Sequence, residues 1–138
     1  MVEEDIYEMY FCGRNKKYPE LCGASFVIYK NGQEMWSNSY FVSDNFANSI
    51  AEYVGLIEGL KRAINMNITR LIVKGCDQLI IKSMSGEFKV KSQDMAKMYK
   101  IAKEIEEKFE SITYQNVYRK YDKRADQLLN DGALTSIF

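Results

Sequence analysis

Short apolar and aromatic runs, separated by turn residues, fill the first 42 positions of the chain. Segments 5–12 and 22–30 are rich in aromatic and β-branched residues, which favours β-strands. Asn31-Gly32 follows the second segment, and Asn-Gly is the strongest short hairpin signal because both residues tolerate a positive φ. A third strand is therefore expected over 34–42, antiparallel to the second.

The pattern then changes to a helical period. Apolar residues recur at steps of three and four from Ile50 to Ile64, which predicts a helix with Asn48 or Ser49 as its N-cap. Segment 70–74 has an apolar centre between two basic residues and predicts a short buried strand. The remaining elements expected are a short helix over 77–83, a helix from a cap at 92 to about 109, a strand over 112–117 and a last helix over 122–130.

This order of elements predicts an α/β fold with a five-stranded mixed sheet and helices on both faces. Because no linker, repeat or low-complexity segment divides the 138 residues, we expect one domain over 1–138. No apolar run approaches the ~20 residues of a membrane span, and the acidic N-terminus lacks a signal-peptide pattern. Three cysteines without CxxC spacing favour a reducing compartment, so we expect a soluble intracellular protein of cytoplasm or nucleus with no membrane partner.

Charge and composition narrow the chemistry. The chain has 19 basic and 19 acidic side chains, so only a local basic patch could attract nucleic acid. It has no histidine, which excludes a histidine general base and any Ser-His or Cys-His catalytic pair.

Three segments carry a resemblance to a known family. "NSIAEYVGLIEGL", "LIVKGCDQLIIKSMSGEFKVK" and "RKYDKRADQLLND" occur in this order, on a helix, a strand-to-helix junction and the last helix. Together they resemble the type 1 ribonuclease H family in its compact form, from about Tyr7 to Ala133. The resemblance implies a ribonuclease H-like fold and cleavage of the RNA strand of RNA–DNA hybrids by two Mg²⁺ ions, held by four carboxylates.

Two of the four carboxylate positions hold cysteine in this chain. Glu52 and Asp126 match the family's glutamate and last aspartate, whereas Cys12 and Cys76 stand where the other two aspartates are expected. Asp77 follows Cys76, but a shift of one residue along a strand turns a side chain to the opposite face. Since a thiol is a poor Mg²⁺ ligand, we expect little or no hybrid cleavage and no resident metal cofactor.

The resemblance also marks candidate contacts to nucleic acid. A loop at 14–19 replaces the family's glycine-rich one and supplies basic residues, and further candidates fall on the first helix, on the segment before the cap at 92, and before the last helix. Helix capping and ordinary solvated charge are the competing interpretations. The candidates are Arg14, Asn15, Lys16, Lys17, Asn48, Ser49, Lys89, Lys91, Arg119 and Lys120.

Three functional hypotheses follow. The first is a degenerate domain that binds RNA–DNA hybrid, another nucleic acid or a protein. The second is an active ribonuclease that uses Glu52, Asp126 and Asp77, with Asp122 as a further candidate, on Mg²⁺ or Mn²⁺. The third is a structural or protein-interaction domain without a nucleic-acid role. The thiols leave a second question open, because the resemblance places the first strand beside the fourth. Cys12 and Cys76 are two unlinked thiols, a disulfide pair under oxidation, or sulfur ligands of an adventitious Zn²⁺.

Overall fold

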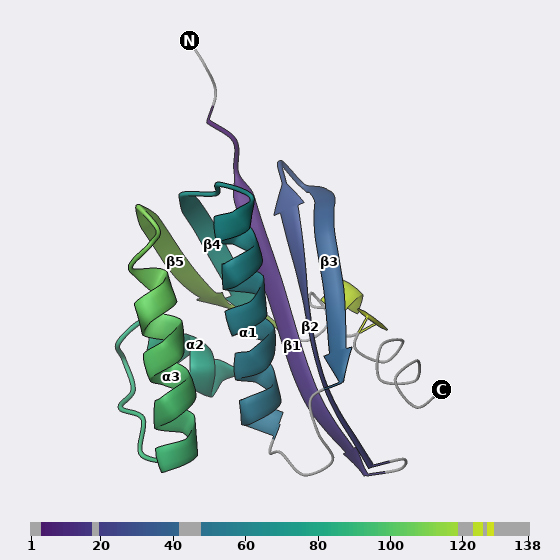
Figure 1. The fold of residues 1–138 in the computed structure, drawn as a ribbon, viewed down its shortest axis with the longest axis vertical. Coiled ribbons are helices and arrows are strands. Elements are labelled where there is room, and N and C mark those ends of the chain that lie inside the picture. The colour runs from purple at the N-terminus through teal and green to yellow at the C-terminus, as the bar shows by residue number, and fades with distance from the viewer. Residues whose placement is uncertain (1–3, 18–19, 42–47, 119–122, 126, 129–138) are drawn as a thin grey trace.

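The computed structural model describes residues 4–17, 20–41, 48–118, 123–125, 127 and 128, with the backbone alone described at 14–17, 20–22, 41 and 48. Its elements are β1 (Tyr7–Lys17), β2 (Glu20–Lys30), β3 (Gln33–Phe41), α1 (Asn48–Asn65), β4 (Arg70–Gly75), α2 (Gln78–Met84), α3 (Gln93–Glu106) and β5 (Ser111–Asn116). Residues 123–125, 127 and 128 are also helical. The predicted order of elements is confirmed (Figure 1).

The strands form one mixed sheet in the order β3-β2-β1-β4-β5. β1, β2 and β3 are antiparallel, whereas β4 pairs parallel to β1 and β5 parallel to β4. Asn31 and Gly32 form the turn between β2 and β3 with φ of 51° and 82°, the positive values that the Asn-Gly pair predicted. The predicted five-stranded α/β fold is therefore confirmed.

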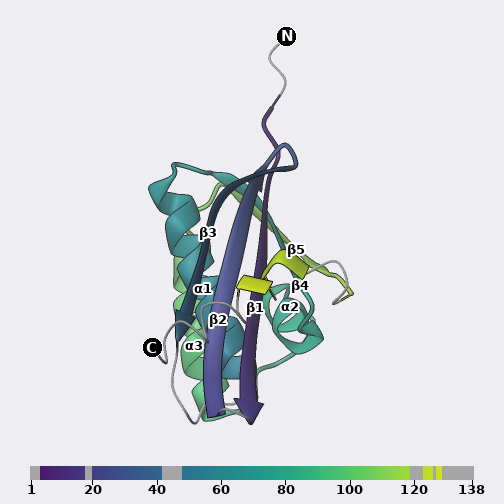
Figure 2. The same cartoon turned by 90° about the vertical axis from the view of Figure 1, so that its right-hand side faces the viewer.

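The segment expected to be a loop at 14–19 is largely strand. β1 continues to Lys17, and its last four residues pair with β2 through Arg14↔Gly23 and Lys17↔Glu20. Figure 2 shows β1 and β2 running on together past the end of β4. The prediction was wrong at 14–17 because cross-strand pairing, rather than the polarity of the side chains, decides where a strand ends.

A smaller correction concerns the start of the first helix. Asn48 and Ser49 both lie inside α1, so neither is its N-cap, and a boundary error of this size is typical of sequence patterns. The cap expected at 92 is confirmed, and a glycine ends the helix before it. Ser92 accepts a hydrogen bond from Met95 N, and Gly86 follows α2 with a φ of +86°.

One face of the sheet packs against α1 and α3 (Figure 1). Small residues at steps of four along α1 let the helix approach the sheet closely: they are Ala51, Gly55, Gly59 and Ala63. A Cβ added at Gly55 would lie 2.7 Å from the Ser25 carbonyl oxygen and 2.8 Å from that of Cys12. The helix backbone therefore rests almost directly on β1 and β2.

The opposite face of the sheet is covered by the last helical residues. Cys12 and Val27 pack there against Ala125 and are bordered by Tyr10 and Leu128, so helical residues cover both faces. No helix in the described part of the chain is long and apolar enough to cross a membrane.

An ion pair also ties these last residues to the sheet. Arg124 Nε donates to Glu34 Oε1 on β3 at 2.8 Å, and this hydrogen bond lowers the pKa of Glu34 below its ordinary value of 4.5. A lowered carboxyl pKa adds stability that is complete above the ordinary pKa and disappears as the pH falls through the folded-state value.

We therefore expect Glu34→Gln to lower the free energy of unfolding at neutral pH by less than about 1 kcal/mol, since both side chains are partly exposed. The difference between variant and parent should shrink as the pH is lowered from neutral through the folded-state pKa of Glu34, which lies below 4.5. Urea unfolding at neutral and at acidic pH measures it. A difference that persists unchanged at the acidic pH would show that the ion pair is not its cause.

Candidate functional site

The side chains of β1 alternate between the two faces of the sheet. Met9 and Phe11 enter the core beneath α1, whereas Tyr10 and Cys12 face the last helical residues. Lys74 of β4 forms an ion pair with Glu8, and its ammonium lies 5.5 Å from the centre of the Tyr10 ring. The hydrogen bond to Glu8 is the main reason that the pKa of Lys74 is raised. This contact shows that even-numbered residues of β1 and β4 share one face.

Cys12 and Cys76 follow the last residue pair between these parallel strands. Phe11 pairs with Gly75. Cys12 is the next residue of β1, on the face shared by Tyr10, whereas Cys76 is the bend residue that directly follows β4. Cys12 is 1% exposed and Cys76 is partly exposed. Both are thiols, and no disulfide joins them. The adjacency of the first and fourth strands, on which the thiol hypotheses depend, is confirmed.

Gly13 lets the first turns of α1 pack closely against β1, next to Cys12. A Cβ built on Gly13 would lie 2.2 Å from the carbonyl carbon of Ala51 and 2.2 Å from Glu52 N. No side chain fits between these two backbones, so glycine is required for their close approach. The backbone nitrogen of Glu52 therefore lies directly beside Gly13. Glu52 is 5% exposed. One carboxylate and two thiols are thus held near the ends of β1 and β4.

Asp77 caps the N-terminus of α2. Its Oδ1 accepts hydrogen bonds from Leu79 N at 3.0 Å and Ile80 N at 3.3 Å, which makes it the N-cap. Burial, followed by the Asp77 charge, raises the pKa of Tyr53 to about 12. Tyr53 belongs to the core beneath α1, on the face of the sheet opposite to Cys12.

Ser25 positions the chain next to Asp126. Its buried hydroxyl donates to the Ala125 carbonyl oxygen at 2.5 Å, and Ser25 is the β2 partner of Cys12. Ala125 itself packs against Cys12. Asp126 lies outside the described residues, so its predicted role as a site carboxylate stays a prediction. Ala125, the residue before it, is nevertheless held beside Cys12 by the Ser25 hydrogen bond.

Ser25→Ala is expected to loosen this anchor. The change leaves a buried carbonyl without its donor, which costs about 1–2 kcal/mol in the free energy of unfolding. Amide hydrogen exchange should accelerate most at residues 123–128, because Ser25 holds that segment to β2. Ser111→Ala, at an exposed position on β5, is the matched control and should change neither measurement. Equal acceleration across the whole sheet would contradict a local anchoring role.

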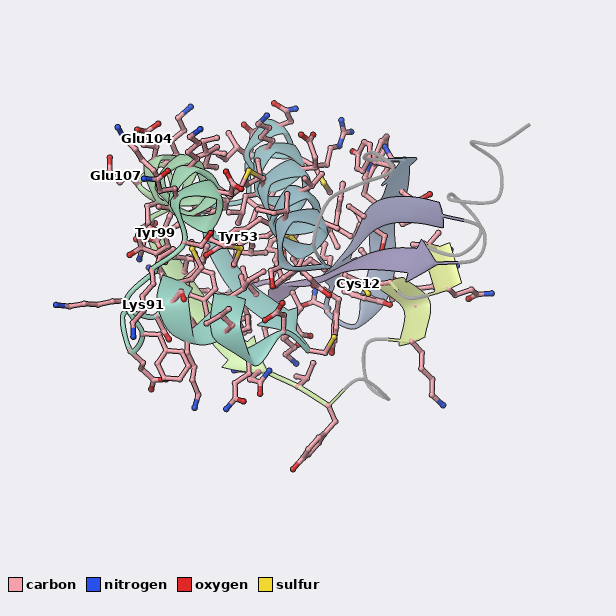
Figure 3. All side chains as sticks on the ribbon, turned by 90° about the horizontal axis from the view of Figure 1, so that it is seen from below. Cys12, Tyr53, Lys91, Tyr99, Glu104 and Glu107 are labelled. Atoms are coloured by element: carbon pink, nitrogen blue, oxygen red, sulfur yellow. The ribbon has the colours of Figure 1, made fainter. Side chains whose placement is uncertain are left out.

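Lys89 and Lys91 lie elsewhere, beside a hollow of about 540 Å³ between α2 and the start of α3. Leu79, Phe88 and Met95 contribute to its apolar lining, and Lys82 Nζ lies 5.1 Å from the centre of the Phe88 ring. Figure 3 shows Lys91 at the left of the view and Cys12 well apart from it, to the right of the centre. The structure therefore separates Lys91 from the thiol of Cys12.

The other predicted contacts are only partly described. Ser49 is half-buried in the first turn of α1, and the backbone of Asn48 precedes it. Arg14, Asn15, Lys16 and Lys17 follow the thiol along β1, with their side chains outside the described set. Arg119 and Lys120 also lie outside the described residues. Whether these groups form one basic patch stays a prediction. Arg124, a further basic residue of the last helical segment, is engaged by Glu34.

The side chains at the four family positions do not suit Mg²⁺, the metal ion that the resemblance implies. Within the described part of the chain, no three Asp, Glu or Cys side chains form a group that could hold a metal ion. Mg²⁺ prefers oxygen ligands in near-octahedral geometry, and two of the expected oxygen positions are sulfur. The expectation of adventitious Zn²⁺ stays a prediction, because Asp126, one of its four ligands, is outside the described residues.

Sequence reasoning missed two residues that build this site, Gly13 and Ser25. Gly13 directly follows the cysteine at the end of an aromatic-rich run, and a glycine there is a recognised sign of close backbone approach. Ser25 is a polar residue in the middle of an otherwise apolar strand. Neither signal says which partner the residue meets.

A comparison with protein families matches residues 13–132 to the reverse transcriptase-like family. The chain belongs to this family. It is a ribonuclease H-like domain, as the sequence motifs and the fold indicated. The match covers most of the chain and includes all three of the motifs that carried the resemblance.

Two curated relatives illustrate the similarity. Bifunctional protein Rv2228c of Mycobacterium tuberculosis is 39% identical over 85 residues, which are 62% of this chain and 23% of the relative. Ribonuclease HI of Halobacterium salinarum is 24% identical over 123 residues, 89% of this chain and 62% of the relative. The chain thus spans less than two thirds of the length of either relative.

Solved structures show the same fold. The N-terminal RNase H domain of Rv2228c, solved as a fusion with maltose-binding protein, has a TM-score of 0.86 and 29% identity, over 92% of this chain and 98% of that chain. LC11-RNase H1 in complex with RNA/DNA hybrid has a TM-score of 0.87 at 22% identity, over 96% of this chain and 99% of that one. At 22% identity the second likeness shows the fold alone.

Proposed function

We propose that this domain binds RNA–DNA hybrid and does not cleave its RNA strand by the two-metal route. The observation that carries the proposal is the pair of thiols, Cys12 and Cys76, at the ends of two adjacent parallel strands. Hard Mg²⁺ and Mn²⁺ prefer carboxylate, carbonyl and water oxygens, so sulfur at these positions removes the ligands that such chemistry needs.

Asp77 does not supply the missing carboxylate in this proposal. It caps α2 through two backbone N–H groups, and its charge acts on Tyr53 in the core beneath α1. Moving it to the thiol face would expose the N-terminus of α2 and cost about 1 kcal/mol for the lost cap. Glu52 is then the one described carboxylate that matches the family pattern, and a single carboxylate is a weak Mg²⁺ site.

RNA–DNA hybrid is proposed as the ligand because LC11-RNase H1, which shares the fold, is in complex with one. The hollow beside α2 supports a role in strand contact. Phe88 is 44% exposed there, and Lys89 and Lys91 are exposed beside it. An exposed aromatic ring among cations suits a nucleic-acid strand, since bases or sugars contact the ring while the ammonium groups neutralise phosphates.

Charge reversal at Lys89 and Lys91 tests the ligand. We expect Lys89→Glu/Lys91→Glu to weaken hybrid binding and to reduce the slope of log affinity against log salt by about 2, one for each phosphate that a lysine no longer neutralises. Lys108→Glu, at an exposed lysine beyond the C-terminal end of α3, is the control and should change the slope little. Fluorescence anisotropy of labelled hybrid over a salt series measures both. Equal effects of the double variant and the control would contradict a specific contact surface.

A cleavage assay on the unmodified chain separates the hypotheses. With Mg²⁺ or Mn²⁺ present, we expect hybrid to be bound at low salt and recovered intact. Accumulation of RNA fragments would instead establish an active ribonuclease with a rearranged carboxylate set. No binding of hybrid, duplex DNA or single-stranded RNA at low salt would overturn the proposal and leave a protein-interaction domain.

A further inference from the structure

The register of β1 and β4 places Cys12 and Cys76 at neighbouring strand ends, an arrangement compatible with a disulfide. Each follows a member of the last residue pair of β1 and β4, Phe11↔Gly75: Cys12 continues β1, and Cys76 is the bend residue directly after β4. Adjacent strands lie about 4.8 Å apart, and the Cα atoms of a disulfide are about 4.4–6.8 Å apart. The two thiols can therefore be joined with little movement of either strand.

The backbone on each side of Cys76 is fixed. The Gly75 carbonyl oxygen accepts hydrogen bonds from Val117 N at 2.9 Å and from Asn116 Nδ2 at 3.1 Å. On the other side, Asp77 caps α2. Cys76 is thus a single residue between the hydrogen-bonded end of β4 and the capped start of α2. These contacts on both sides keep the Cys76 thiol close to the end of β4.

Cys12 is fixed as well, but it is covered. It pairs with Ser25 on β2, and α1 rests on its carbonyl at Gly55. Its side chain is 1% exposed beneath Ala125, whereas Cys76 is partly exposed. A reagent in solution therefore reaches Cys76 more readily than Cys12.

We infer that Cys76 and Cys12 form a dithiol modification site that reacts with low-molecular-weight disulfides and closes to an intramolecular disulfide. Cys76 is the attacking residue, and Cys12 is the resolving residue. The site uses the same two sulfur atoms that disfavour Mg²⁺, yet the inference does not depend on nucleic-acid binding and stands if the proposed function fails.

The reaction balances with glutathione disulfide as the oxidant. The Cys76 thiol loses its proton, and its sulfur attacks one glutathione sulfur, which breaks the glutathione S–S bond and releases one glutathione thiol. The Cys12 thiol then loses its proton and attacks the Cys76 sulfur, which breaks the mixed disulfide and releases the second glutathione. Two cysteine thiols are oxidised and one glutathione disulfide is reduced to two thiols.

The experiment uses the full chain and needs no variant for its decisive result. Reduced protein is incubated with glutathione disulfide at neutral pH, remaining thiols are alkylated, and peptides are mapped by mass spectrometry without reduction. We expect one linked pair of peptides that contains Cys12 and Cys76, a mass lower by two hydrogen atoms, and alkylated Cys22. The melting temperature should rise and return on reduction, because the crosslink closes a long loop in the unfolded chain.

Two variants assign the order of attack. Cys12→Ala, which keeps a small apolar residue beneath Ala125, should retain glutathione on Cys76 as a stable mixed disulfide. Cys76→Ser should leave Cys12 reduced until the protein is unfolded, and Cys22→Ser should behave as the parent. The inference is overturned if the unmodified chain keeps glutathione on Cys76 without a crosslink, if the crosslink involves Cys22, or if Cys12 is oxidised equally in Cys76→Ser.

Discussion

Gly13→Ala is expected to unfold the domain or to lower its free energy of unfolding by more than about 3 kcal/mol, out of the roughly 5–15 kcal/mol typical of a small domain. The added Cβ would lie 2.2 Å from both the carbonyl carbon of Ala51 and Glu52 N. Both are backbone atoms of a buried helix, so relief requires α1 to move away from β1. Circular dichroism and urea unfolding of the purified variant measure the loss.

Gly32→Ala is the matched control. Gly32 has a φ of +82°, which strains any side chain, but nothing lies within 4 Å of an added Cβ. Its cost should therefore be the conformational one alone, about 1 kcal/mol. If both variants lost the same stability, the close approach of α1 to β1 would not be the reason that position 13 is glycine.

The sequence predicted this fold well because local signals and global topology agree. The Asn31-Gly32 turn, the Ser92 cap and the apolar face of α1 each point to the element that the structure contains. The end of β1 was not predictable in this way. Arg14 to Lys17 carry polar side chains, and only their backbone pairing with β2 makes them a strand.

The candidate site was likewise predictable only in part from the sequence. The family resemblance assigned Cys12, Cys76 and Glu52, and the parallel register of β1 and β4 places the two cysteines directly after the pair Phe11↔Gly75. Spacing could not show that Cys12 is covered by Ala125 while Cys76 remains partly exposed, since burial depends on a helix more than a hundred residues further along the chain. That difference in exposure, rather than the residue types, gives the thiols separate roles.

Restoring the two aspartates is expected to create a Mg²⁺ site. Cys12→Asp/Cys76→Asp places carboxylates beside Glu52, at the strand ends where the family pattern has them. Without metal, the variant should be less stable than the parent, because position 12 is 1% exposed and a buried unpaired carboxylate is costly. A bound divalent cation neutralises that charge and should restore the stability.

Thermal unfolding at increasing Mg²⁺ concentration measures this linkage. At a hundredfold excess over the dissociation constant, Mg²⁺ should stabilise the double aspartate variant by about 2.7 kcal/mol, whereas the parent should not respond. Cys12→Asn/Cys76→Asn has side chains of similar size without charge, so it should be destabilised yet insensitive to Mg²⁺. If the double aspartate variant melts at the same temperature in millimolar Mg²⁺ as in chelator, the ends of β1 and β4 do not hold the geometry of a metal site, and the loss of two-metal hydrolysis cannot be assigned to the thiols.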